Sequence, residues 1–403
     1  MKTKLKLTQL NFTRNACILF AGMTGLSSLT YGADSLDTWI SEGKPSLTLN
    51  PRFEYGDTTG LDVSRAATLK TLLGYTTGDW IGFKALVEFN NTTALDYDDY
   101  NGAGLNGQGG KTPIADPETT EVNQVYLSYG IEMGSLTVGR QRIILDNARM
   151  IGNVGWRQNE QTYDAIKLSA TPVDGLTLTG IYIDEVNRIF SDARDWDSES
   201  FLFNANYKVS KALNVTGYYY YYDLVGAGAP ADEVDTYGLI VKGSVSIDDD
   251  LSINYYLEGA TQDYLAVNPT YYHAVLGTAF KGFSLDFGYE VLGSDAGAGQ
   301  FLTPLATAHK FNGFADAYLD NGGANGLEDF YIKLGAKFGK LSLTAVYHDF
   351  SSEEGSARDG DEFDFVAVYP ITKSIKALGK VALYESDTGT ETDRYILQVT
   401  YTY

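Results

Sequence analysis

The sequence predicts an all-β protein, a transmembrane antiparallel β-barrel of about 18 strands. Stretches of alternating apolar and polar residues recur along the chain from Ser46, as expected of strands with one face on lipid. The composition is rich in tyrosine (30), phenylalanine (19) and glycine (43) and poor in proline (9), which suits many strands joined by tight turns. No apolar run reaches the roughly 18 residues that a transmembrane helix requires. If the chain crosses a membrane, strands must do it.

The N-terminus has the pattern of an export signal. An apolar stretch covers residues 16–29, small residues precede Asp34, and basic residues come before the apolar stretch at Lys2, Lys4, Lys6 and Arg14. We therefore predict that residues 1–33 are a cleaved signal peptide, with cleavage after Gly32 as the alternative, and that residues 34–403 form a single outer-membrane β-barrel domain. The only cysteine, Cys17, lies in the signal, so the mature chain is expected to contain no disulfide.

The charge of the chain is strongly negative, with a formal net value of −22. Removal of residues 1–33 takes away four basic residues and no acidic ones, which leaves about −26. This charge argues against nucleic acid as a partner. Acidic exposed loops could bridge through Ca²⁺ or Mg²⁺ to anionic lipid headgroups, but carboxylates that merely keep the loops soluble explain the same composition. No cofactor is expected.

Individual strands are visible in the alternation. In residues 80–90, Phe83 and Val87 fall on one side while Lys84 and Glu88 fall on the other. A soluble β-sandwich would alternate too, but the export signal and the abundance of tyrosine favour lipid on the apolar face. The clearest strands are predicted at 47–55, 80–90, 213–223, 237–246, 251–259, 283–291, 341–350 and 394–403.

The connections alternate between short and long, and this pattern gives the topology. Eight short turns are predicted at 78–79, 132–134, 172–175, 210–212, 248–250, 281–282, 339–340 and 372–374. Longer connections include 91–119, 144–160, 186–198, 292–325 and 351–361. Eight turns and nine loops give about 18 strands, with short periplasmic turns, long extracellular loops and both termini in the periplasm. The expected location is the outer membrane of a Gram-negative bacterium.

Basic charge is concentrated between Thr137 and Leu168, which hold four of the eleven arginines. The alternation slips between Val138 and Ile143, and Gly139 is the natural position for a β-bulge. After such a slip, Arg140 and Arg142 lie opposite the apolar face. Arginine facing lipid costs up to about 2–4 kcal/mol at mid-depth, so both side chains are predicted to point into the lumen.

The stretch GRQRIILDNARMIGNVGWRQNEQTYDAIKL (139–168) resembles the signature of the alginate-export family of outer-membrane channels, and EVNRIF (185–190) resembles a second, shorter element of that family. The resemblance implies an 18-stranded monomeric channel with an electropositive constriction for an anionic polysaccharide or smaller anions. It implies a basic lining formed by Arg140, Arg142, Arg149, Arg157 and Arg188.

Strand parity adds further inward-pointing residues. The basic residues among them are Arg52, Lys70, Lys84, Lys167, Lys242, Lys333, Lys376 and Lys380. Trp156 with its neighbouring glycines suggests a tight loop tip in or over the pore. Arginine binds carboxylates in a bidentate manner, so such a lining suits a polyuronate. Inward carboxylates such as Glu54, Glu88 and Glu290 leave an alternative open, in which salt-bridge ladders stiffen the barrel and select no solute.

These features predict a passive channel for anionic solutes, most concretely an acidic, alginate-like oligosaccharide or polysaccharide. The alternatives are a porin without uronate selectivity, a plugged structural barrel, and a rim-site hydrolase built on His348, Asp349 and Ser351, which lack a nucleophile motif. An enzyme is not expected. The expected partners are outer-membrane lipid and lipopolysaccharide, the anionic carbohydrate, and the outer-membrane assembly machinery, which would bind the last strand ending at Tyr403.

Overall fold

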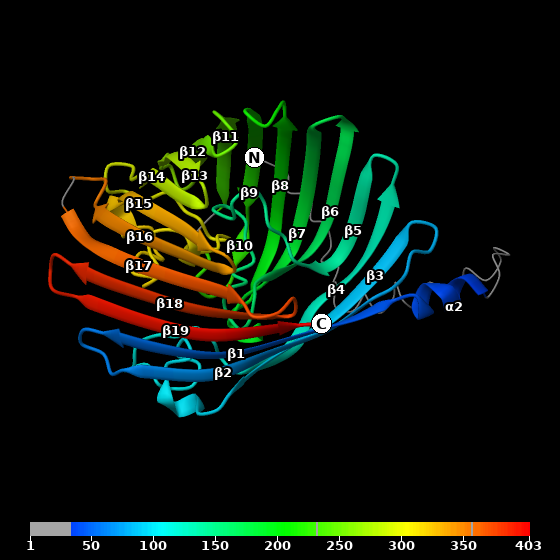
Figure 1. The fold of residues 1–403 in the computed structure, drawn as a ribbon, viewed down its shortest axis with the longest axis horizontal. Coiled ribbons are helices and arrows are strands. Elements are labelled where there is room, and N and C mark those ends of the chain that lie inside the picture. Colours follow the sequence, from blue (N-terminus) through cyan, green and yellow to red (C-terminus); the bar gives the residue numbers. More distant parts are fainter. Residues whose placement is uncertain (1–33, 231–232, 356–357) are drawn as a thin grey trace, which may run out of the picture.

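The computed structural model describes residues 34–230, 233–355 and 358–403, which form an antiparallel β-barrel (Figure 1). The predicted signal peptide, residues 1–33, lies outside the described residues. A short helix, α2 (Asp34–Ser41), precedes the first strand, and no helix of the described chain is long and apolar enough to span a membrane.

The strands follow one another around the barrel in chain order. They are β1 (Lys44–Thr58), β2 (Ser64–Thr76), β3 (Phe83–Ala94), β4 (Thr119–Ile131), β5 (Gly134–Gln141), β6 (Thr162–Val173), β7 (Leu176–Asn187), β8 (Trp196–Lys208), β9 (Asn214–Tyr222), β10 (Leu224–Val225), β11 (Val234–Ser246), β12 (Leu251–Asp263), β13 (Thr270–Phe280), β14 (Phe283–Leu292), β15 (Leu327–Phe338), β16 (Leu341–Ser351), β17 (Arg358–Pro370), β18 (Ile375–Ser386) and β19 (Glu391–Thr402).

The barrel closes because β1 pairs with β19 on one side and with β2 on the other, with Phe53 opposite Leu397. The two-residue β10 continues β9 and pairs with the same neighbour, β8, so the described segments make 18 barrel strands. This confirms the predicted fold class. The eight predicted short turns lie at one rim, together with the start of β1 and the end of β19, and this rim is the periplasmic one.

Alternation sets which side chains face outward. In β8, Leu202 is buried while its neighbours Phe201 and Phe203 are 54% and 48% exposed on the outer wall. Exposed aromatic rings gather near both rims, as interface girdles require. Near the short turns they are Tyr129, Tyr207, Phe280, Phe283, Phe338 and Tyr369, and near the long loops Tyr237, Tyr272, Tyr289, Phe330, Tyr347, Phe363 and Tyr395.

Two local predictions were wrong. The strand predicted from Trp80 begins only at Phe83, because Ile81 and Gly82 have positive φ values of 49° and 89° and form the turn. Gly139 does have a positive φ of 122°, but β5 pairs with β4 and β6 without a register shift. The nearby bulges lie instead in β4, opposite Glu88 and Phe89, and in β7, around Asp184.

Candidate functional site

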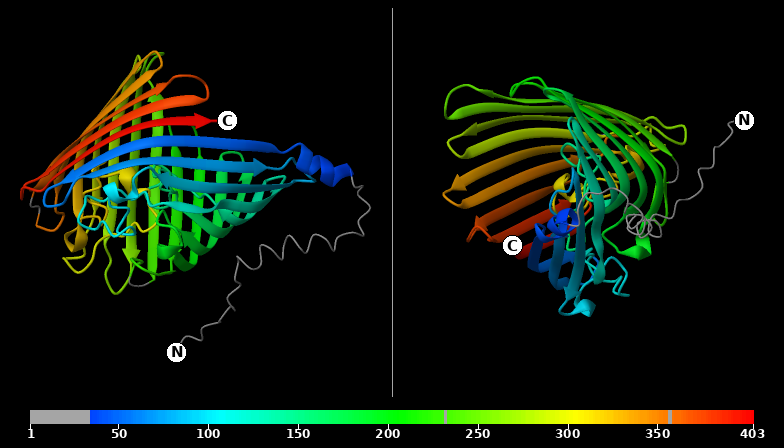
Figure 2. Two further views of the ribbon diagram at one scale, coloured as in Figure 1. Left: turned by 90° about the horizontal axis from the view of Figure 1, so that it is seen from below. Right: turned by 90° about the vertical axis from the view of Figure 1, so that its right-hand side faces the viewer.

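Two long connections fold into the lumen and join each other there. The first, residues 142–161, links β5 to β6, and the second, residues 293–326, links β14 to β15 and includes the short helices η4 (Ala308–Lys310) and η5 (Gly323–Asn325). Ile151 forms a β-bridge with Leu305, and the Gly152 N–H donates to the Leu305 carbonyl at 2.8 Å. The yellow part of the second connection is seen inside the ring of strands in Figure 2. The two connections therefore form one internal layer that narrows the lumen.

The internal layer is held to the barrel wall by Arg157. Its side chain is only 4% exposed, and its two terminal nitrogens lie 3.2 Å from Glu54 of β1 and 3.2 Å from Asp316 of the second connection. Asp116, in the connection between β3 and β4, lies 3.6 Å away. Burial alone would lower the pKa of Arg157, but these three carboxylates raise it above its usual value. The guanidinium remains charged and joins three separate segments.

A stack of rings and cations lies beside Arg157. The ring of Trp156 stacks on His309 with centroids 3.2 Å apart, and the Arg157 guanidinium lies 3.8 Å from the Trp156 ring centroid. His309 contacts Asp316 through Nδ1 at 2.7 Å and the Lys380 ammonium of β18 through Nε2 at 2.7 Å. Burial lowers the pKa of His309 to about 3, so its ring is neutral at physiological pH. Trp156 therefore fastens the two connections together at their centre.

Three other predicted arginines are also paired with carboxylates. Arg52 of β1 lies 3.3 Å from Asp116 and donates to the Trp156 carbonyl, so it shares the Arg157 network. Arg149 lies 2.8 Å from Glu290 and is fully buried. Arg142 donates to Glu160 through Nε at 2.7 Å and lies 3.5 Å from Glu88 on the inner wall.

Arg140 differs from the prediction of an inward arginine. It makes a two-point contact with Asp164, at 2.7 Å and 3.1 Å, and stands opposite Asp164 in the β5–β6 ladder. Gln141 and Tyr163 form the next pair of that ladder and are buried in the interior. Because facing residues share a side and successive residues alternate, Arg140 belongs to the opposite face of the sheet. The unbroken register through Gly139 is the reason.

A cavity of 380 Å³ lies on the extracellular side of the internal layer, lined mainly by the long connections. Arg188 borders it and lies 3.8 Å from the centroid of the Trp196 ring and 4.8 Å from that of Phe190. Within the described part of the chain, no carboxylate makes an ion pair within 4.0 Å with the guanidinium of Arg188 or of its neighbour Arg194, although Asp195 accepts a hydrogen bond from the Arg188 backbone N–H at 2.6 Å. Burial and the charge of Arg194 lower the pKa of Arg188 to about 10, which leaves it charged at neutral pH.

Lysines occupy the other side of the internal layer. Lys310 donates to the Asn147 carbonyl at 2.8 Å, and burial together with the charges of Lys333 and Lys242 lowers its pKa. Lys167 is on the inner wall of β6, as predicted from parity, in the pair with Ile181 of β7. None of these four ammonium groups is within ion-pair distance of a carboxylate in the described residues.

The family of the chain follows from its sequence. The model of the family described as "Alginate export" matches residues 47–264, which is more than half of the 403 residues. The chain belongs to the alginate export family. The match contains the first inward connection, Arg188 and Arg194, so the two elements that carried the predicted resemblance both lie within it.

Solved structures of outer-membrane porins share the fold of this alginate export family member. Pseudomonas aeruginosa OccK7 (OpdD) has a TM-score of 0.69 at 17% identity, covering 90% of this chain and 99% of that chain. Acinetobacter baumannii OccAB3 has a TM-score of 0.69 at 16% identity, covering 90% and 100%. At these identities the likeness shows the fold alone. A comparison with curated proteins finds no match.

Several residues in the interior of this alginate export family member could not be recognised as site residues from the sequence. Asp116, Asp316, His309 and Arg394 carry no local motif, although Arg394 lies 3.2 Å from Glu54 and closes the Arg157 network. Parity did place Glu54 and Lys380 inward. It could not show that they meet the central connections, because that contact depends on how the long connections fold.

The hydrolase alternative finds no support in the geometry around His348. This histidine contacts Asp329 through Nδ1 at 2.9 Å, whereas the next residue, Asp349, pairs with Arg358 on the outer face. In the described residues no serine hydroxyl is hydrogen-bonded to His348. The family and the structural neighbours are porins, which are non-enzymatic channels.

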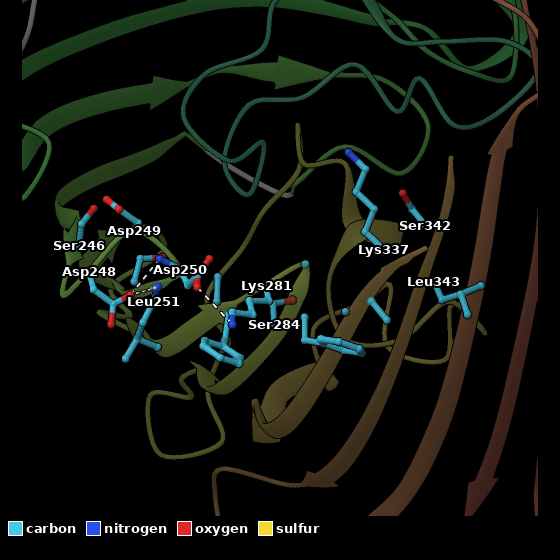
Figure 3. Close-up of a pocket in the computed structure, with 17 residues that line it drawn as sticks. Ser246, Asp248, Asp249, Asp250, Leu251, Lys281, Ser284, Lys337, Ser342 and Leu343 are labelled. Carbon is cyan, nitrogen blue, oxygen red and sulfur yellow. Dashed lines mark hydrogen bonds and ion pairs between the residues drawn. The ribbon is translucent and has the colours of Figure 1, made fainter. Parts of the chain in front are cut away.

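A second hollow, of 530 Å³, lies between the short turns at the periplasmic rim (Figure 3). Its ion pair, Lys281 with Asp250 at 3.3 Å, is more than half exposed on both sides. It lacks a buried charge or a converging set of polar groups, and we assign it no role.

Proposed function

We propose that this outer-membrane channel passes anionic solutes by passive diffusion, with acidic oligosaccharides or polysaccharides of the alginate type as the main class. The observation that carries the proposal is the division of the basic residues into two sets. The arginines inside the internal layer form ion pairs with carboxylates. The guanidinium of Arg188 at the outer cavity, that of its neighbour Arg194 beside Phe190, and the lysines on the inner side do not.

The basic residues without a carboxylate partner lie on both sides of the constriction. A carboxylate that enters the outer cavity meets Arg188 against the Trp196 and Phe190 rings, and rings of this kind offer flat apolar surfaces to a sugar. Beyond the internal layer it meets Lys310, Lys333, Lys242 and Lys167. Asp286 and Asp146 also lie on this inner side and reduce the net positive charge.

The paired set has a different role in this proposal. Arg142, Arg149, Arg157 and Arg52 fix the shape of the constriction, because a guanidinium held between carboxylates attracts a passing anion weakly. A porin without uronate selectivity remains the second candidate, and this neutralisation of the central arginines is the observation that favours it.

The test is the reversal potential of single channels in planar bilayers under a salt gradient. We expect anion selectivity in the wild type, a weaker selectivity in Arg188→Gln/Arg194→Gln, and block by oligouronates at lower concentration than by neutral oligosaccharides. Each lost charge is worth about 1 kcal/mol at contact in water, or roughly fivefold in the blocking concentration. Arg358→Gln is the matched control, because this exposed arginine already contacts three aspartates. A cation-selective wild-type pore favours the general porin, and a silent one the plugged barrel.

A further inference from the structure

The helix α2 lies at the periplasmic rim of the barrel, where it contacts the outward-facing side of β2 and the turn between β2 and β3. Tyr75 of β2 donates a hydrogen bond from its hydroxyl to the Ile40 carbonyl. In the β2–β3 ladder, Tyr75 stands opposite Val87 and takes the same parity as Leu73, which is 55% exposed on the lipid-facing wall. Figure 1 and the left view of Figure 2 show α2 just past the ends of the strands, where β1 begins. The helix is therefore continuous with the surface that meets lipid.

The attachment of α2 to the barrel is specific. Trp39 is 6% exposed, and its indole Nε1 donates to the Phe83 carbonyl at 3.1 Å. Its own carbonyl accepts from the Gly78 N–H at 2.8 Å, and its ring lies 6.1 Å from the ring of Trp80. Phe83 in turn packs on Tyr129 of the periplasmic aromatic girdle, with centroids 4.5 Å apart. The side of the helix that carries Trp39 thus packs against the periplasmic aromatic girdle.

The rest of the α2 surface is divided between apolar and polar residues. Leu36 and Ile40, one turn apart, are 46% and 57% exposed, and Ile81 in the adjoining turn is 61% exposed. Asp37 and Ser41 are exposed on the other side of the helix. At 100° per residue, Leu36, Trp39 and Ile40 fall within one third of the circumference. A short amphipathic helix with tryptophan at its base is the arrangement that lies in a membrane interface.

We propose that α2 is an interfacial anchor that inserts Leu36, Ile40 and Ile81 into the periplasmic leaflet of the outer membrane. Its occupant is the boundary between phospholipid headgroups and acyl chains, because the apolar side of the helix continues the lipid-facing wall of β2 and the aromatic girdle. Asp37 and Ser41 face the periplasm. The anchor fixes the start of β1, next to the seam where β1 meets β19, at a defined depth.

Spin labels on the reconstituted mature chain, residues 34–403, test this proposal. Single cysteines replace Leu36, Ile40 or Asp37 in the mature chain, which is expected to contain no other cysteine, and the labelled protein is placed in vesicles of phosphatidylethanolamine and phosphatidylglycerol. Leu73→Cys is the lipid-exposed control and Asp249→Cys, in a periplasmic turn, the aqueous control. We expect labels at 36 and 40 to collide with oxygen as often as at 73, and the label at 37 to collide with a water-soluble nickel chelate as often as at 249.

Two results would overturn the anchor. Labels at 36 and 40 that are as accessible to the nickel chelate as the label at 249 would show that the helix stands in water. Labels shielded from both oxygen and nickel would show that α2 packs on protein instead of lipid. Because a bulky label could detach the helix, Ile40→Ser in otherwise native protein provides a second measurement. Lipids brominated near the headgroup should quench the tryptophan fluorescence of this variant less than that of the wild type. The quenching reports on α2 because Trp39 and Trp80 adjoin the leaflet, whereas Trp156 and Trp196 lie in the lumen.

Discussion

Replacement of Arg157 by methionine should release the internal layer from the barrel wall. The arginine side chain is 4% exposed and lies within 3.6 Å of Glu54, Asp116 and Asp316, which belong to three different segments. Methionine preserves much of the volume and the contact with Trp156 but leaves the carboxylates without their shared cation. Removal of one partner from a buried ion pair costs about 3–5 kcal/mol. Arg52 and Arg394 still face Glu54, so the lower end of that range is expected.

This free-energy cost destabilises the packed state of residues 142–161 relative to a released state in which they leave the barrel wall. The barrel itself is unaffected, because the 18-stranded wall retains its backbone hydrogen bonds. About 3–5 kcal/mol corresponds to a roughly 150- to 5,000-fold increase in the ratio of released to packed connection. Hydrogen exchange of the amides in residues 142–161 should accelerate accordingly, while exchange in β14 to β16 stays unchanged. Single-channel conductance should rise and become noisier, since the released connection no longer narrows the lumen.

The control is Arg358→Met. Arg358 also contacts three aspartates, at Asp349, Asp361 and Asp387, but it is exposed near the extracellular rim, where solvent screens its charge. Its loss should leave both exchange and conductance unchanged. Equal protection of residues 142–161 in wild type and Arg157→Met, with unchanged conductance, would refute the idea that this arginine holds the layer in place.

Two further perturbations address the same layer. A Cβ at Gly152 would lie 2.2 Å from the Thr307 hydroxyl and 2.8 Å from the Thr307 backbone nitrogen, so Gly152→Ala should separate the two connections at a cost of about 1–3 kcal/mol and raise the conductance. Gly180→Ala is the control, because the added carbon there meets open space and should leave the conductance unchanged. Equal conductance in the two variants would contradict this expectation. The pKa of His309 is lowered to about 3 from 6.5, so the released state binds the extra proton and the packed state loses stability as pH falls from about 6.5 toward 3. We expect the protection factors of the amides in residues 293–326, which are corrected for the intrinsic exchange rate at each pH, to fall over that pH range in the wild type and to stay constant in His309→Gln. Protection factors independent of pH in the wild type would count against the neutral buried ring.

The sequence by itself determined the wall of the barrel. Period-two alternation is a local property, so strands such as 47–55 and 394–403 could be located, and the alternation of short and long connections led to 18 strands. Parity also placed Arg52, Glu54, Lys167 and Lys380 on the inner side. The single slip assigned to Gly139 failed because a glycine with positive φ can remain within an unbroken ladder, and the bulges that do occur lie in β4 and β7.

Only the tertiary structure decided which of the basic residues remain unpaired. Arg157 meets Glu54 and Asp316 across 103 and 159 residues of sequence, and no local pattern specifies either contact. The four arginines between Thr137 and Leu168 look like a concentration of positive charge, yet folding brings a carboxylate to each. Burial of a charge requires a partner. For Arg149 and Arg157 that partner came from distant strands that the inward connection reaches, whereas Arg140 and Arg142 pair with Asp164 and Glu160, 24 and 18 residues away. Arg188, in the shorter and weaker sequence element, is the predicted arginine left without one.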